Sequence, residues 1–111
     1  MSSIETIERI SKKYAMSSEE FIKLGSTLAM KEKKRNLQIE RVEILSRYEV
    51  NTVEELENKI KEGVVPEHPA WEDLIEIKNI EAEIREIESD ISAGSGLQPE
   101  PLNFVYAVNK D

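Results

Sequence analysis

The feature that most constrains this chain is a helical pattern of apolar residues that no proline interrupts between Ser17 and Pro66. Apolar residues recur there at helical spacing, namely Phe21, Leu24, Leu28, Leu37, Ile39, Val42, Ile44, Leu45 and Tyr48. Such spacing is typical of an amphipathic helix. Ser17 and Glu20 also have the spacing of a capping box, in which each side chain bonds the other residue's backbone N–H. The sequence therefore predicts one long helix over about 18–48.

Three further helices are expected from the same periodicity. A short helix over 3–14 carries Ile4, Ile7, Ile10 and Tyr14 on one side. Another over 53–62 opens with the capping pattern of Thr52 and Glu55 and ends before Gly63, a residue common just past helix ends. A second long helix over about 71–91 follows Pro69 and carries an isoleucine seam with steps of 3, 4, 3 and 4, formed by Ile77, Ile80, Ile84, Ile87 and Ile91. This spacing is that of a coiled-coil interface, so the seam is a candidate oligomer or partner interface.

The predicted fold class is mainly α, a helical hairpin or bundle. We expect one helical domain over 1–91, followed by a flexible linker and strand-like tail over 92–111. The tail holds Phe104 and Tyr106 within its apolar run 102–108, and a lone strand cannot satisfy its own backbone groups. We therefore expect the tail to be disordered, to pair with its own copy or to add to the sheet edge of a partner. Alternatively, the preceding Gly/Ser stretch is an engineered linker and the tail is a fused peptide.

Charge is distributed very unevenly along the chain. Residues 1–48 carry ten Lys/Arg against seven Asp/Glu, whereas residues 49–111 carry five against sixteen, giving +3 and −11. The acidic half repels nucleic acid and attracts a basic protein partner. The one basic run comprises Lys31, Lys33, Lys34 and Arg35. We expect it to be a solvated or salt-bridged helix face, with a nucleic-acid contact as the weaker alternative.

No catalytic, cofactor or metal site is predicted. The chain has no cysteine and a single histidine, His68, which a proline-framed loop explains as a turn or cap residue. The serines lie mainly at helix starts, and the four glycines match no phosphate-binding fingerprint. No apolar run has the length of a membrane span, and the N-terminus lacks signal-peptide features. We therefore expect a cytoplasmic protein that is not an enzyme.

Trp71 is the one large aromatic residue in the second long helix. We expect it to be a buried core anchor held in place by the neighbouring prolines, with a partner-binding hot spot as the alternative.

The segments around 10–22 and 47–56, together with the run Gly63 to Leu74, resemble small prokaryotic, mainly archaeal, antitoxin-like proteins encoded beside a toxin. The likeness covers residues 4 to about 91. The first two helices are also similar to the helical half of ribbon-helix-helix antitoxins, whose DNA-reading strand has no counterpart ahead of Ile4. Glycine is expected after the tyrosine at both helix ends, where Ala15 and Glu49 stand, so a left-handed turn there costs about 1 kcal/mol.

Two classes of function follow. The first is an antitoxin-type protein that neutralises a basic toxin through its acidic helices and its tail. The second is a homo-oligomeric helical assembly module without a toxin partner.

Overall fold

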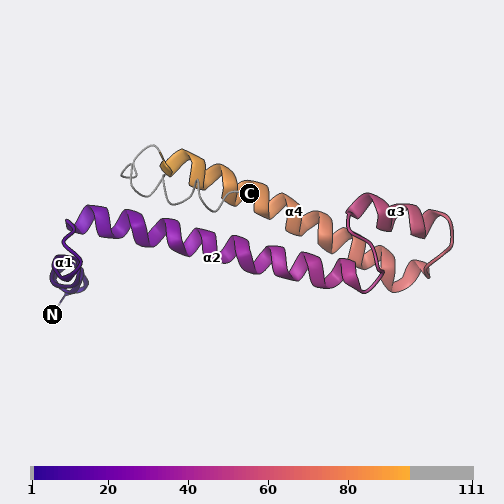
Figure 1. Ribbon diagram of the computed structural model, residues 1–111, viewed down its shortest axis with the longest axis horizontal. Coiled ribbons are helices and arrows are strands. Elements are labelled where there is room, and N and C mark those ends of the chain that lie inside the picture. The colour runs from indigo at the N-terminus through magenta and orange to yellow at the C-terminus, as the bar shows by residue number, and fades with distance from the viewer. Residues whose placement is uncertain (1, 96–111) are drawn as a thin grey trace. The chain divides into compact units, whose positions relative to one another are not determined.

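The computed structural model of the chain describes residues 2–95, and all regular structure within them is helical (Figure 1). The elements are α1 (Ser3–Lys13), α2 (Ser18–Ser46), α3 (Val53–Lys61) and α4 (Glu67–Ser95). The prediction of a mainly-α fold with two long and two short helices is therefore confirmed. The tail residues Phe104 and Tyr106 lie outside the described residues.

Side-chain caps account for where three helices begin, and two of these caps, at α2 and α3, were predicted. Glu20 N–H donates to the Ser17 hydroxyl at 3.1 Å, and Ser17 N–H donates to the Glu20 carboxylate at 2.9 Å. Ser2 and Glu5 form the same reciprocal pair ahead of α1. At α3, Glu55 N–H donates to the Thr52 hydroxyl, but the Glu55 carboxylate accepts from Asn51 N–H instead of Thr52 N–H.

Helices α1, α2 and α3 all end with the same backbone motif. A residue with positive φ follows each helix, at Ala15 (φ 58°), Glu49 (φ 56°) and Gly63 (φ 74°). The N–H of the next residue then bonds a carbonyl five positions back, as Val50 N–H does with Leu45 O at 3.3 Å. This is a Schellman motif, which ordinarily has glycine at the left-handed position. Only α3 has glycine there, whereas Ala15 and Glu49 adopt the left-handed conformation with a β-carbon, the case for which a cost of about 1 kcal/mol was expected.

The described helices belong to two compact units, residues 2–31 with 89–95 and residues 32–88. In the first unit, the rings of Tyr14 and Phe21 stack with centroids 5.8 Å apart across the turn that joins α1 to α2. Ser11 and Thr27 are buried there.

The second unit, which we call the hairpin unit, consists of residues 32–88. There α2 and α4 are antiparallel, as shown by ion pairs between Lys34 and Glu88 at 3.2 Å and between Arg41 and Glu81 at 2.7 Å. Helix α3 contributes Leu56 and Ile60 to the shared core. The other core residues are Leu37, Ile44, Leu45, Val50, Val53, Ala70, Leu74, Ile77, Ile80 and Ile84.

The observed helix ends differ from the predicted ones by one residue in α1 and α3 and by two or more in α2 and α4. Helix α2 stops at Ser46 because Arg47 to Glu49 form the left-handed turn. Helix α4 begins at Glu67, and a kink follows at His68, whose φ and ψ are extended, as expected for a residue that precedes proline. It continues to Ser95, so the linker predicted from residue 92 is wrong for its first four residues.

The prediction that Trp71 is a buried core anchor is wrong, because its side chain is 44% exposed. Ala70 and Leu74 are the residues of this turn that face the core, with exposures of 0% and 1%. Successive residues of a helix differ by about 100° in direction, so Trp71 points away from that contact.

Candidate protein-binding surface

The exposed apolar residues of the hairpin unit include a group where α3 meets α4. Trp71 and Ile75 are 44% and 47% exposed, and their spacing of four places them on one face of α4. Val64, in the connection from α3 to α4, is 62% exposed. The exposed position of Trp71 favours a role as a partner-contact residue over a role as a core anchor.

A cavity of about 330 Å³ lies beside Trp71. It is lined by Ile60 and Lys61 from α3 and by Glu67, His68 and Trp71 from α4. A volume near the lower end of the range for ligand pockets accommodates a side chain or a small group. We call this cavity the Trp71 pocket.

One side of the Trp71 pocket carries an exposed histidine–carboxylate pair. His68 Nδ1 lies 2.8 Å from a carboxylate oxygen of Glu72, one helical turn further along. This hydrogen bond is the main reason why the pKa of Glu72 lies below its usual value, so the carboxylate is negatively charged near neutral pH.

The surroundings of the pocket are strongly acidic. Residues 53–76 hold eight Asp/Glu and only Lys59 and Lys61 as fully charged cations. Both lysines are engaged: Lys59 Nζ donates to the Tyr48 carbonyl, and Lys61 Nζ lies 3.6 Å from Glu57. Four exposed carboxylates of this segment form no ion pair or hydrogen bond with other described residues, and they are Glu54, Glu62, Glu67 and Glu76. We call residues 53–76 the acidic end of the hairpin unit.

The acidic end is held in position by contacts around Tyr48, which sequence reasoning missed. Tyr48 OH donates to Asp73 Oδ2 at 2.5 Å, while Arg47 approaches the same oxygen at 3.5 Å. Partial burial and, next, the bond to Asp73 raise the pKa of Tyr48 to about 12, so its hydroxyl keeps its proton at any ordinary pH. With Lys59 bound to the Tyr48 carbonyl, one turn of chain connects α2, α3 and α4.

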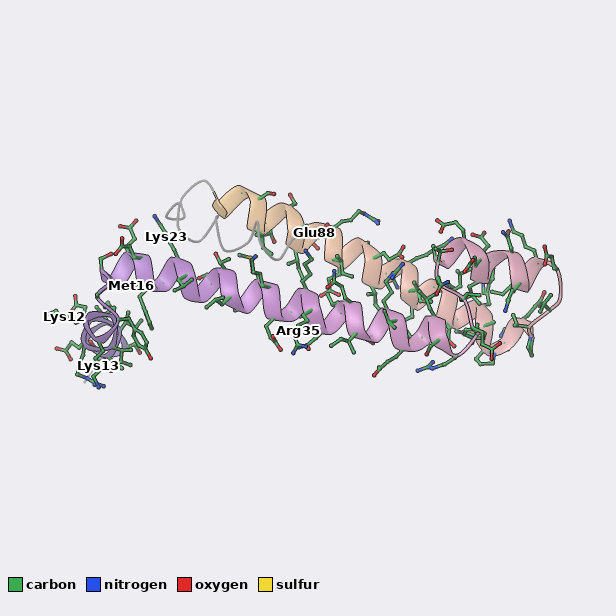
Figure 2. All side chains as sticks on the ribbon, viewed as in Figure 1. Lys12, Lys13, Met16, Lys23, Arg35 and Glu88 are labelled. Atoms are coloured by element: carbon green, nitrogen blue, oxygen red, sulfur yellow. The ribbon has the colours of Figure 1, made fainter. Side chains whose placement is uncertain are left out.

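The basic run is largely paired within the chain. Lys33 lies 3.9 Å from Glu83, Lys34 lies 3.2 Å from Glu88 and Arg35 lies 3.0 Å from Glu32. Arg35 projects from the side of α2 away from α4 (Figure 2). Lys31 also has an interaction partner. These pairs favour the salt-bridged interpretation of the run over a nucleic-acid contact.

The predicted isoleucine seam faces the chain's own core. Ile77, Ile80 and Ile84 are at most 9% exposed, and Ile87 is partly buried against them. They pack with α2 and α3, so they offer no free surface to a second copy. Ile91 is of intermediate exposure and belongs to the other unit.

Neither a metal cluster nor a membrane-spanning helix is found in the part of the chain that the structure describes. Across residues 2–95, no three His, Asp or Glu side chains gather in a way that could hold a metal ion. None of the helices in that range is long and apolar enough to cross a membrane.

The fold and this surface define a helical protein with an acidic, partly apolar surface region at one end of the hairpin unit. Residues 1–93 match the family described as "Uncharacterized protein MJ0235 family", and the chain belongs to that family. No curated protein and no solved structure matches the chain. The family description mentions neither toxin nor antitoxin.

Proposed function

We propose that this protein binds a basic protein partner through the acidic end of the hairpin unit, as an antitoxin binds and neutralises its toxin. The observation that supports the proposal is the exposed Trp71, which shares a pocket with the unpaired Glu67 and lies in a segment with three further carboxylates that no cation of the described chain neutralises. Tryptophan is enriched among residues that dominate binding energy, and opposite charges speed association and select partners. The cytoplasmic setting and the tail contact through Phe104 and Tyr106 belong to the same proposal.

The test is direct binding of the protein encoded by the adjoining gene, measured by calorimetry. Charge reversal of Glu62 and Glu76 to lysine removes two of the unpaired carboxylates without touching the core. We expect affinity to fall at least about tenfold, equivalent to about 1.4 kcal/mol. A matched control reverses Glu8 and Glu40, which are also exposed but lie outside the acidic end.

The control separates local recognition from the effect of net charge, because both variants change that charge equally. Equal weakening by the two variants, or no binding by the natural chain, would contradict the proposal. If the adjoining protein is a toxin, co-expression restores growth with the natural chain and fails with the Glu62/Glu76 variant.

A second candidate is self-assembly through the outer face of α2, favoured by two exposed apolar residues. Ile39 and Val42 are 44% and 58% exposed, and Glu32, Arg35 and Ser46 continue the face at coiled-coil spacing. A parallel second copy would oppose identical charges at 32 and 35. An antiparallel copy instead places each Ile39 against the other copy's Val42.

Light scattering tests this assembly. Changing Ile39 and Val42 together to Asp is expected to halve the mass while leaving the helical circular dichroism intact. A natural chain that is monomeric, or a variant of unchanged mass, would exclude this face as the interface.

A further inference from the structure

The Trp71 pocket is lined by both apolar and charged residues. Ile60, which is 7% exposed, and the half-exposed indole of Trp71 form the wall. The charged residues that line it are Lys61, Glu67 and His68. A group that fills the pocket must satisfy both the flat indole surface and these charges.

Two of the three charged residues that line the pocket are paired within the chain, and the remaining unpaired charge is negative. Lys61 is engaged by Glu57 at 3.6 Å, and His68 is engaged by Glu72 at 2.8 Å. Glu67 forms no hydrogen bond or ion pair with any other described residue. A bound anion would therefore meet an unpaired carboxylate, and a purely apolar group would leave that carboxylate without a partner.

The positively charged side chain of a lysine or an arginine can contact the indole surface and also neutralise the unpaired carboxylate. The face of an indole attracts a cation within about 6 Å of the ring, and arginine adds stacking of its planar guanidinium. A guanidinium can also donate two parallel hydrogen bonds to one carboxylate, which a lysine ammonium cannot match in geometry. The exposed Glu67 lies at the same pocket as the indole and is available for that contact.

We infer that the Trp71 pocket receives a single arginine side chain of the partner, stacked on the indole and paired with Glu67. This inference rests on the proposed function and specifies which group of a basic partner the acidic end recognises. It predicts a preference for arginine over lysine, which charge attraction to the surface as a whole would not produce.

The test uses Trp71 itself as the reporter, because it is the chain's one tryptophan. The probes are three capped tripeptides, Gly-Arg-Gly, Gly-Lys-Gly and Gly-citrulline-Gly, titrated while the Trp71 indole N–H is followed by NMR and its emission by fluorescence. Citrulline keeps the planar shape of arginine and removes its charge. We expect a saturable shift with the arginine peptide, several-fold weaker binding of the lysine peptide and at least about tenfold weaker binding of the citrulline peptide.

Two variants locate the contact. Glu67→Gln is expected to weaken the arginine peptide about three- to tenfold, whereas Glu8→Gln, a control in the other unit, leaves it unchanged. Trp71→Leu is expected to abolish the peptide-induced shifts of the Ile60 and Lys61 amides while the circular dichroism stays the same. Equal binding of arginine and citrulline, or of the natural chain and Glu67→Gln, would overturn the inference.

The outcome can be separated from that of the broader proposal. Suppose that the adjoining gene's product binds and is weakened by reversal of Glu62 and Glu76, but the arginine peptide does not perturb Trp71. The proposed function then stands and the pocket assignment is wrong. Failure of both experiments removes the proposed function as well.

Discussion

Replacing Glu49 by glycine should stabilise the hairpin unit, although it removes a charged side chain and introduces the most flexible residue. Glu49 follows α2 with φ of 56°, a left-handed conformation in which a β-carbon crowds the following carbonyl oxygen. Gly63 has the same position after α3 and carries no such cost. The two turns therefore form an internal comparison within one unit.

The magnitude follows from two opposing terms. The left-handed conformation costs a residue with a β-carbon about 1–2 kcal/mol. Glycine loses more freedom on folding, which offsets about 0.4–1 kcal/mol of that gain. The expected net stabilisation for Glu49→Gly is about 0.5–1 kcal/mol, or a rise of roughly 3–6 °C in Tm for a domain of this size.

Urea unfolding followed by circular dichroism at 222 nm measures this change. The midpoint should move up without a change in slope, because the surface exposed on unfolding stays the same. Glu49→Ala is the matched control: it removes the carboxylate and keeps the β-carbon, so its stability should stay within about 0.5 kcal/mol of the natural chain.

Gly63→Ala completes the comparison. An added β-carbon there would have no neighbour within 4 Å, so its cost comes from the backbone conformation alone. We expect a loss similar in size to the gain from Glu49→Gly. Should Glu49→Gly fail to stabilise while Gly63→Ala costs nothing, the left-handed turns are not strained and the reasoning is refuted.

Three further predictions concern the core, the pocket and the tyrosine contact. Ile77→Ala should lower the free energy of unfolding by about 2–5 kcal/mol, whereas Ile39→Ala on the outer face should cost less than about 0.5 kcal/mol in the same denaturation assay. Trp71→Leu should change stability far less than Ile77→Ala, and a loss as large would show that the indole is part of the core. The raised pKa of Tyr48 means that folding favours its neutral hydroxyl, so this stabilisation is complete below pH about 10 and lost as pH rises towards about 12. Thermal unfolding across that range should show the loss, and Tyr48→Phe should reduce it.

Local patterns predicted the helices because their signals lie within a few residues of each other. The Ser17–Glu20 pair fixes the start of α2, and the isoleucine spacing identifies the buried face of α4. The exposed position of Trp71 was not predicted, because its large aromatic side chain suggested burial whereas its place in the helical spacing of apolar residues indicates exposure. Extending the seam backwards from Ile77 by three and then four residues reaches Leu74 and Ala70, so the core position of that turn belonged to Ala70.

Contacts between distant segments were predicted only in outline. Equal rise along antiparallel helices indicates only roughly which residues of α2 and α4 lie level, as Lys34 and Glu88 do at 3.2 Å. The exact register depends on contacts such as the hydrogen bond from Tyr48 OH to Asp73. Nothing in the local sequence marks a hydrogen bond between residues 25 positions apart.

We propose the acidic end around Trp71 as the place where a basic partner binds. The most direct measurement is Trp71 fluorescence during titration with the protein encoded by the adjoining gene, made with a tryptophan-free variant of that partner at two salt concentrations. We expect a saturable change in emission whose midpoint shifts to higher partner concentration as salt rises. Reversal of Glu62 and Glu76 should weaken this binding. A complex that forms without altering Trp71 emission, or whose affinity is unaffected by salt and by those two charges, would contradict it.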